Sequence, residues 1–528
     1  MFKETDLPDD TEALKAMIIA QAAELAAKEA VIIQKEGAIS AKEDCITRLE
    51  ALVKAFRAAM FGRRSEKLNP DQYDLALEDI EVGIVATGAE DKTAAQAVEK
   101  VRQPKSERAS LPQHLPRIDE VIEPESTLCA CGCHMHAIGE DVSERLDIIP
   151  AQFRVIVTRR PRYACRTCED GIVQAPAPGR LIPGGLPTEA TVAQVLISKY
   201  ADHLPLYRQS QIYARQGIKL DRSTLAGWVG RAAFELRPVY DCLLNQLKRS
   251  SKLFMDETPV PVLDPGRRKT KTGYLWALAR DDRPWNGEGP PGVAFAYAPG
   301  RSGQHGEDML SGFRGTLQVD GYAGYNRLAR RAEAPLNLAY CWAHARRKLM
   351  DVAKNNVAPI AEEGLKRIAA LYRIEADIRG QSADVRLAVR QERAAPLMDA
   401  FKIWLDQSQA RVLGKSPLGQ ALGYITKHWD GLSLYLTDGR VEIDNNTVER
   451  TIRPIALNRK NALFAGHDVG AQNWAVIASL IETCKLNAVD PQAWLTQTFS
   501  AIVTGHRQAN IEGLLPWNRK VATTEGAP

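Results

Sequence analysis

Four short β-rich runs lie in the middle of the chain, between long stretches of helical character. The runs KLFMDETPVPVL, GYLWALARD, VAFAYAPG and GTLQVDGYA fall between residues 252 and 323, separated by turn text such as DPG, NGEGPPG and RSGQ. Apolar runs bounded by Gly and Pro are typical of strands. Helix-like sequence on both sides of these runs therefore predicts a multidomain α/β protein.

The composition fits a soluble globular chain. The 528 residues suggest three or four domains, and 45% hydrophobic with 25% charged residues excludes collagen-like, mucin-like and wholly disordered classes. The net charge of only +4 makes local clusters of basic residues more informative than the total. The acidic N-terminal sequence MFKETDLPDD is no secretory signal, and no apolar run approaches the ~20 residues of a membrane span. We expect a cytoplasmic protein without a membrane partner.

The N-terminal region reads as one long helix followed by a spacer. In residues 1–68, apolar side chains recur every seven residues from Ile18 to Val53, which favours a left-handed coiled coil. Charged residues interrupt the seam, so a solvated single helix stays open as the alternative. Residues 69–118 are poor in aromatic residues and end in a basic, proline-containing sequence, which predicts a flexible linker. Weak contact with DNA phosphates is the alternative role of this segment.

Two cysteine clusters between residues 119 and 175 indicate a zinc-binding module. The first, CACGCHMH, supplies Cys129 and Cys131 together with Cys133 and two histidines; the second, CRTC, supplies Cys165 and Cys168. Two cysteine pairs about thirty residues apart can hold one tetrahedral Zn²⁺, which can supply the folding energy of a small module. The spacing alone does not choose the ligands of the first cluster. Incidental cysteines or a redox pair are the alternatives.

A helix-turn-helix segment is predicted within residues 188–250. Gly217 would end the first helix, because glycine readily takes positive φ, and Asp221 or Ser223 would cap the second. Helical periodicity turns Leu225, Trp228 and Val229 toward a core. That arrangement leaves three residues for DNA: Arg222, Thr224 and Arg231. An ordinary helical hairpin explains the same pattern.

Three acids at defined places predict a catalytic metal site. Asp256 and Asp320 each follow apolar residues of a predicted strand. Glu449 lies on a short helix that Asp444 or Asn445 would cap and that we expect to end near Pro454. Carboxylates of this kind are the ligands that Mg²⁺ or Mn²⁺ prefers, and two such ions would serve phosphodiester chemistry. Each acid alone is more typical of a surface or cap residue. Their order, strand then strand then basic helix, favours the functional interpretation.

Basic residues surround these acids in the sequence and are predicted to contact DNA. They are Arg346 and Arg347 after a strand-like segment, and Arg450, Arg453, Arg459 and Lys460 after Glu449. Cys341 and His344 in YCWAHARRKL could form a second zinc pair, but this sequence is more typical of the start of a helix with a basic face.

Several long motifs, in this order, resemble transposases of the insertion sequence 66 family, of the TnpC type. The matching stretches are FGRRSEKL, SLPQHLPR, GEDVSERLDIIPAQFRVIVTRRPRYACRTC, MDETPVPVL, QVDGYAGYN, CWAHARRKL and NNTVERTIRPIALNRKNALFAGHDVGAQNWAVIASLIETCKLN. They cover nearly the whole chain. The first cysteine pair departs from the family pattern of C-x-x-C followed by Gly-Gly: Cys131 aligns with the second cysteine, and Leu128 falls where the first would be.

The resemblance implies an RNase H-like catalytic core with a DDE triad, placed by motif position on Asp256, Asp320 and Glu449. It implies double-stranded DNA partners (terminal inverted repeats and target), accessory TnpA- and TnpB-type proteins, and a nucleoid-associated location. Synapsis of two ends favours a homodimer or higher oligomer. The expected domains are 1–68 coiled coil, 69–118 linker, 119–175 zinc module, 188–250 helix-turn-helix, 251–485 catalytic domain with a helical insertion at about 350–440, and 486–528 C-terminal helical segment and tail.

Three other functions remain open at this stage. A non-catalytic DNA-binding regulator, such as a decayed copy, would bind DNA without cutting it. An RNase H-like nuclease or resolvase would cut without joining. A zinc-stabilised scaffold that assembles through its coil would show no metal-dependent chemistry.

Overall fold

The structure is a computed structural model that describes residues 117, 119, 121, 152–164, 172–264, 267, 269–330, 336–355 and 358–519. The chain divides into two compact units, residues 1–148 and 149–528, and the fold below belongs to the second. The predicted coiled coil, almost all of the linker, and the four expected zinc ligands Cys129, Cys131, Cys165 and Cys168 lie outside the described residues. Those predictions are therefore not tested by the fold.

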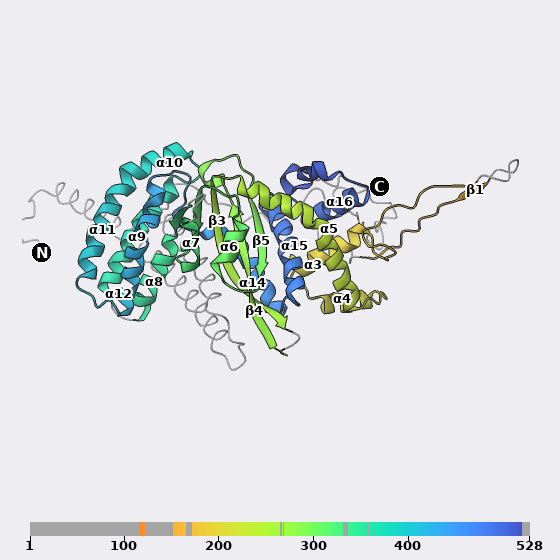
Figure 1. The fold of residues 1–528 in the computed structure, drawn as a ribbon, viewed down its shortest axis with the longest axis horizontal. Coiled ribbons are helices and arrows are strands. Elements are labelled where there is room, and N and C mark those ends of the chain that lie inside the picture. The colour runs from red at the N-terminus through yellow and green to blue at the C-terminus, as the bar shows by residue number, and fades with distance from the viewer. Residues whose placement is uncertain are drawn as a thin grey trace, which may run out of the picture. The chain divides into compact units, whose positions relative to one another are not determined.

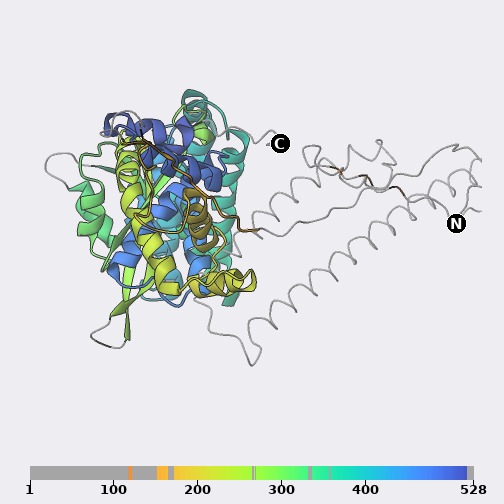
Figure 2. The ribbon, with the colours of Figure 1, turned by 90° about the vertical axis from the view of Figure 1, so that its right-hand side faces the viewer.

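A five-stranded mixed sheet forms the centre of the second unit (Figure 1). Its strands are β3 (Lys252–Asp264), β4 (Lys269–Arg280), β5 (Gly292–Ala298), β6 (Thr316–Val319) and β7 (Asn337–Tyr340). The spatial order is β5-β4-β3-β6-β7. Strands β3, β4 and β5 form an antiparallel meander, whereas β6 runs parallel to β3 and β7 runs parallel to β6. The four predicted β-rich runs are confirmed as strands, and the end of the long β3–β4 hairpin projects from the body (Figure 1; Figure 2).

The outer edge of β5 is closed by side chains of a neighbouring helix. Helix α15 (Asp468–Leu486) lies along this strand, and the backbone N–H groups of Val293 and Phe295 donate to the hydroxyls of Thr483 (3.1 Å) and Ser479 (2.7 Å). On α5 (Arg222–Lys248), the Tyr240 hydroxyl donates to the Phe295 carbonyl at 2.8 Å. An exposed strand edge is a template for unwanted pairing, so these contacts protect it.

The predicted pair of helices around Gly217 is present, but the second helix is a core helix. Helix α4 (Leu206–Arg215) ends just before Gly217, which has φ +79°, and α5 follows for 27 residues. Leu225, Trp228 and Val229 are buried as expected, in the same hydrophobic core as the sheet. Asp221 is the N-cap residue of α5, yet its side chain makes no capping hydrogen bond. The pair thus packs onto the sheet core.

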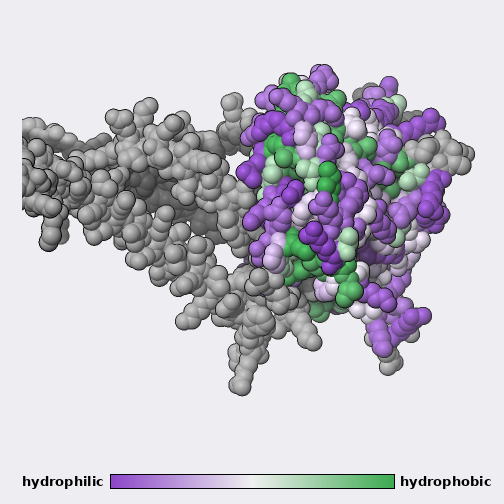
Figure 3. Space-filling model, turned by 90° about the vertical axis from the view of Figure 1, so that its left-hand side faces the viewer, coloured by the Kyte–Doolittle hydropathy of each residue, from purple (hydrophilic) through white to green (hydrophobic). Residues whose placement is uncertain are grey.

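Helices that follow β7 build a second hydrophobic cluster beside the sheet. They are α8 (Trp342–Asn355), α9 (Pro359–Asp377), α10 (Ala383–Val389), a π-helical turn (Arg390–Ala394), α11 (Ala395–Gln409), α12 (Pro417–Lys427) and α13 (Trp429–Ser433). Trp342, Phe401 and Leu422 are fully buried within this cluster. Its outer face is mainly hydrophilic, with scattered apolar side chains (Figure 3). These helices, called the insertion below, lie between Trp342 and Ser433, and the expected bounds of about 350–440 stay a prediction.

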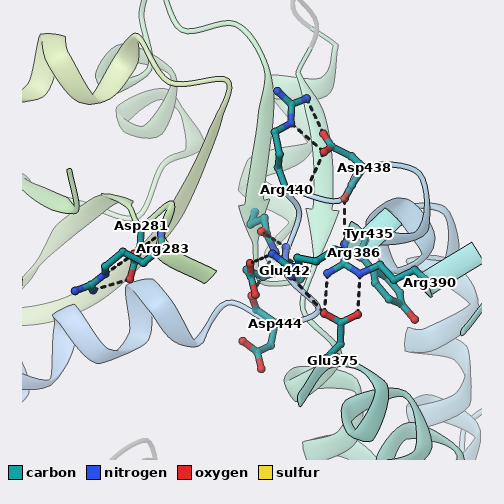
Figure 4. Close-up of polar contacts among 11 residues, drawn as sticks. Asp281, Arg283, Glu375, Arg386, Arg390, Tyr435, Asp438, Arg440, Glu442 and Asp444 are labelled. Atoms are coloured by element: carbon teal, nitrogen blue, oxygen red, sulfur yellow. Dashed lines mark hydrogen bonds and ion pairs between the residues drawn. The ribbon is translucent and has the colours of Figure 1, made fainter. Parts of the chain in front are cut away.

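A buried ionic network ties the insertion to the segment before the next helix (Figure 4). Arg390 donates to both oxygens of Glu375 at 2.7 Å, and Arg386 donates to Glu442 at 2.8 Å. All four side chains are at least nine-tenths buried. The network therefore fixes the position of Glu442, seven residues before Glu449.

The remaining elements complete the unit. They are β1 (Arg162–Ala164), β2 (Ile172–Gln174), α3 (Glu189–Tyr200), α6 (Gly303–Met309), α7 (Asn326–Ala329), α14 (Asn446–Asn461) and α16 (Pro491–Val503), with short 3₁₀ turns at Arg283–Trp285, Ala323–Tyr325, Leu434–Leu436, Gln508–Leu514 and Pro516–Asn518. Helix α16 packs against α3, and the Trp494 indole donates to the Leu514 carbonyl at 3.1 Å. No helix among the described residues is long and apolar enough to cross a membrane.

Candidate active site

Strand register brings Asp256 and Asp320 to the same level of the sheet. Phe254 on β3 pairs in parallel with Gln318 on β6, and each aspartate lies two residues beyond its partner in that pair. Because side chains alternate along a strand, both carboxylates emerge on the same face, at the carboxyl end of β6. The sequence placed Asp256 at a strand end; instead β3 continues past it to Asp264, since its second half pairs with β4 in the long hairpin.

The chain leading into α14 is attached directly to these two strands. The Gln318 side chain donates to the Glu442 carbonyl at 2.9 Å and accepts from the Glu442 N–H at 2.8 Å. The fully buried Asn445 side chain donates to the Met255 carbonyl at 3.4 Å, next to Asp256. These contacts start α14 at the sheet edge, so Glu449 in its first turn is buried beside the aspartates.

Helix α14 differs from its prediction at the C-terminal end. It does not end near Pro454 but continues to Asn461. A proline inside a helix frees the carbonyl four residues earlier, here that of Arg450, which is exposed and so accessible to water. The longer helix carries Arg459 and Lys460 in its last turn.

The electrostatics show that the three predicted acids share one environment. Burial raises the pKa of Asp256 well above its usual value, and the nearby charges of Asp320, Glu449 and Glu257 raise it further. A hydrogen bond from the Glu257 N–H to Asp256 Oδ1, 2.8 Å long, opposes this effect only in part. Asp320 Oδ1 accepts the Tyr322 N–H at 2.9 Å. Carboxylates gathered in this way repel one another, and their oxygen donors fit a hard divalent cation.

Asp444 adds a further acid that the sequence identified only as a cap. Burial raises its pKa to about 6, helped by the charges of Glu442 and Glu449 and opposed by a hydrogen bond from the Asn446 N–H. With Glu442 and Arg450 it lines a cavity of about 230 Å³ on the side of α14, next to the Asp281–Arg283 ion pair at 2.8 Å (Figure 4). The lining contains three acids and three arginines: Asp281, Glu442, Asp444, Arg283, Arg379 and Arg450.

Cys341 and His344 lie against Glu449. Ligand atoms of these three residues lie within 4.8 Å of one another, and His344 Nδ1 is 3.8 Å from Glu449 Oε1. The Cys341 thiol, however, accepts the backbone N–H of Asn445 at 3.1 Å. Burial raises the pKa of the Cys341 thiol well above the usual range, and the charges of Glu449 and Asp444 add to this. Helix α8 begins at Trp342, directly after Cys341, so the predicted helix start is confirmed.

The residues predicted to contact DNA fall into two groups. Arg222, Thr224 and Arg231 are exposed on the first turns of α5, where Arg231 pairs with Glu235. The others lie on the two helices beside the acids: Arg346 and Arg347 on α8, and Arg450, Arg453, Arg459 and Lys460 on α14. Arg450 and Lys460 are exposed, whereas Arg459 donates to the Pro259 carbonyl on β3. That bond gives Arg459 a structural role, and DNA contact by all nine residues stays a prediction.

Gln318 and Glu257 had no sequence signal strong enough to single them out, and Asn445, the N-cap residue of α14, was predicted only as a possible cap. Gln318 and Asn445 act through contacts with residues more than a hundred positions away. Glu257 follows Asp256 directly, and its carboxylate is buried against Arg301 and Tyr325. The one signal that could have indicated Glu257 is its position directly after the predicted acid Asp256.

We expect Asp256→Asn to stabilise the protein in buffer without added Mg²⁺, by about 1 to 3 kcal/mol. The change removes a partly buried charge that three carboxylates repel, and asparagine keeps an oxygen for the Glu257 N–H. The folded pKa of Asp256 lies above its unfolded value of 3.8, so the wild type loses stability as pH rises through the folded pKa. Denaturant unfolding should therefore show a difference in stability between variant and wild type that is small below pH 4 and grows at higher pH.

Added Mg²⁺ should stabilise the wild type more than the variant. Equal stabilisation of both would contradict a cation site at Asp256.

The fold and the site together define a mixed α/β protein whose central sheet carries partly buried carboxylates beside two basic helices. The chain belongs to the transposase IS66 family, whose family model matches residues 184–473. Three further models match: a zinc-finger binding domain of transposase IS66 at residues 126–169, an IS66 C-terminal element at 479–517, and a "Transposase C of IS166 homeodomain" at 48–119. The first of these spans the predicted cysteine ligands and supports a structural zinc.

Relatives of similar length occur in Sinorhizobium fredii (strain NBRC 101917 / NGR234). The uncharacterized protein y4qI is 43% identical over 532 residues, covering 98% of each chain. The uncharacterized protein y4jD is 46% identical over 483 residues, covering 89% of this chain and 94% of the relative. A third, y4hP, is 38% identical over 499 residues, covering 90% and 89%. They match this chain nearly end to end.

Proposed function

We propose that this protein is a DDE transposase with an RNase H-like core, which cleaves the ends of an insertion sequence and joins them to target DNA. The observation that supports the proposal is that Asp320 and Glu449 lie close enough to Asp256 for their charges to raise its pKa, at one partly buried place on the sheet. The strand order β5-β4-β3-β6-β7, with three antiparallel strands and two parallel ones, supports the RNase H-like assignment.

In this proposal the three acids would hold two Mg²⁺ or Mn²⁺ ions. Bound there, the ions would polarise the phosphodiester and activate first water and then a 3′-hydroxyl. Asp256 and Asp320 are fixed by the backbone N–H groups of Glu257 and Tyr322, and Glu449 by the attachment of α14 to the sheet. The residues therefore keep their positions before DNA arrives, which lowers the cost of forming the reactive geometry.

Binding of DNA completes the proposal. The nine basic and polar residues on α5, α8 and α14 would contact the terminal inverted repeats and the target DNA. Zn²⁺ would stabilise the zinc-binding module at residues 119–175, held by Cys129, Cys131, Cys165 and Cys168. Two protomers, with TnpA- and TnpB-type accessory proteins, would pair the two ends in the cytoplasm, at the nucleoid. Positive charge on α8 and α14 offsets the repulsion between the acids and the phosphate backbone.

A strand-transfer assay tests this function. Purified full-length protein is incubated with labelled DNA from the ends that flank its own gene, with Mg²⁺ or EDTA, and with and without the products of the neighbouring open reading frames. We expect joined products only with Mg²⁺. Binding without cleavage would favour a regulator, cleavage without joining a nuclease or resolvase, and neither activity a scaffold.

A further inference from the structure

Arg301 reaches the edge of the acidic cluster from the loop between β5 and α6, and one buried carboxylate anchors it. Its Nε donates to Glu257 Oε1 at 2.6 Å, and its Nη2 lies 2.6 Å from the same oxygen. The Glu257 side chain is 0% exposed, and its other oxygen accepts the Tyr325 hydroxyl at 2.5 Å. The anchor thus holds one edge of the guanidinium in a fixed direction.

Tyr322 holds the guanidinium from a second side and links it to Asp320. The Arg301 guanidinium carbon lies 4.0 Å from the centre of the Tyr322 ring, and the Tyr322 hydroxyl donates to the Arg301 carbonyl at 2.6 Å. The N–H of the same tyrosine donates to Asp320 Oδ1. Arg301 and Asp320 are therefore positioned by one residue.

Close packing of two loops maintains this arrangement. Gly303, two residues after Arg301, faces Gly324, two residues after Tyr322. A Cβ added at Gly303 would lie 2.4 Å from the Gly324 carbonyl oxygen, so only glycine permits this approach. The loop that carries Arg301 is set by contact with the loop that follows Asp320.

The guanidinium remains charged and accessible. Burial lowers the pKa of Arg301, but the carboxylates of Glu257 and Asp320 raise it more, so the net shift is upward. The side chain is still 45% exposed. Within the part of the chain that the structure describes, its Nη1 has no hydrogen-bond partner. A planar cation with one edge anchored and another open suits a phosphate oxygen.

We propose that Arg301 binds a phosphate of the DNA strand beside Asp320, next to the phosphodiester that reacts. This inference rests on the proposed function, because it assigns a DNA contact to that same site. The alternative is a purely structural role, in which Arg301 only neutralises the buried carboxylate of Glu257. The two roles differ in what happens when Glu257 also loses its charge.

The test compares four full-length variants with the wild type in the strand-transfer assay: Arg301→Gln, Glu257→Gln, the double variant, and Arg393→Gln as a matched control. Arg393 is 47% exposed and pairs with Asp377 at 2.8 Å, in the insertion. We expect Arg301→Gln to reduce kcat/KM for DNA ends by about 10- to 100-fold. The double variant should be no more active than Arg301→Gln, and Arg393→Gln should match the wild type. Recovery of wild-type activity in the double variant, or full activity of Arg301→Gln, would overturn the proposal.

Two further measurements cover the remaining outcomes. In the first, single phosphates near the cleavage site are replaced by uncharged methylphosphonates. At one position the replacement should slow strand transfer by the wild type but leave the rate of Arg301→Gln unchanged. If Arg301→Gln does not fold, the double variant Arg301→Gln with Glu257→Gln, which leaves no unpaired buried carboxylate, serves in its place and should show the same loss of sensitivity. If the wild type makes no joined product, the proposed function fails, and DNA binding alone decides about Arg301. The variant should then lower the slope of log affinity against log salt by about 0.9, whereas an unchanged slope would exclude the contact.

Discussion

Strand transfer is expected to fall by about 10³-fold or more when Asp256, Asp320 or Glu449 is replaced by its amide, a loss of roughly 4 kcal/mol of transition-state stabilisation. The amides keep the size of the side chains, so the sheet and α14 should stay in place, but each removes a negative charge needed to hold a divalent cation. Quantified joined product against time in Mg²⁺ provides the measurement. All three variants should lose cleavage and joining together, because the same acids serve both steps.

The matched control is Asp384→Asn, an exposed acid on α10 outside the cluster. This variant should retain wild-type rates. Binding of the element ends, measured without Mg²⁺, should stay within about twofold for every variant, because the basic residues proposed to contact DNA are unchanged. A triad variant that kept normal strand transfer would remove that residue from the site, and a variant that lost end binding as well would indicate misfolding instead.

Replacing Arg390 by Ala should lower the free energy of unfolding by about 3 to 5 kcal/mol. Arg390 is fully buried, donates to both oxygens of Glu375, and also donates to the carbonyls of Tyr435 and Asp438. Among the residues that the structure describes, its removal leaves the buried Glu375 carboxylate with the longer contact to Arg386, at 3.4 Å. Denaturant unfolding followed by tryptophan fluorescence measures the loss, since Trp342 and Trp429 lie in the same helical cluster.

Arg393 in the same π-helical turn provides the comparison. Its pair with Asp377 is half exposed, so Arg393→Ala should cost less than about 1 kcal/mol. Similar losses for the two variants would show that burial of the Arg390 network contributes little. Arg390→Ala should also reduce strand transfer, because the network fixes Glu442 and with it the start of α14.

The sequence predicted those parts of the fold that have a local signature. Apolar runs between Gly- and Pro-rich turns located the central strands, and periodicity located the core residues of α5. The prediction was wrong where a local signal met a non-local contact. Pro454 is a helix breaker in isolation, yet α14 continues through it. Asp256 resembles a strand end, yet pairing with β4 extends β3 by eight residues.

The parts of the site that the sequence did not reveal depend on contacts between distant residues. The Gln318 side chain bonds to the backbone of Glu442, and Arg386 reaches Glu442 from the insertion. Neither contact has a sequence pattern, because glutamine and arginine are ordinary surface residues unless the tertiary fold buries them. The supporting partners Glu257 and Arg301 lie 44 positions apart. Candidate acids could therefore be named from sequence, but the residues that hold them could not.

Glu449 lies on α14, which follows the helical insertion in the chain, and this order has a consequence for synthesis of the chain. The ribosome adds Glu449 about 190 residues after Asp256, which corresponds to roughly 10 to 40 s at ordinary elongation rates. During that interval the nascent sheet can carry both aspartates but lacks the third acid. A chain cut short inside the helical insertion has the same deficit. The long separation thus delays a complete acidic centre until the insertion has been made, and it keeps truncated products from acquiring one.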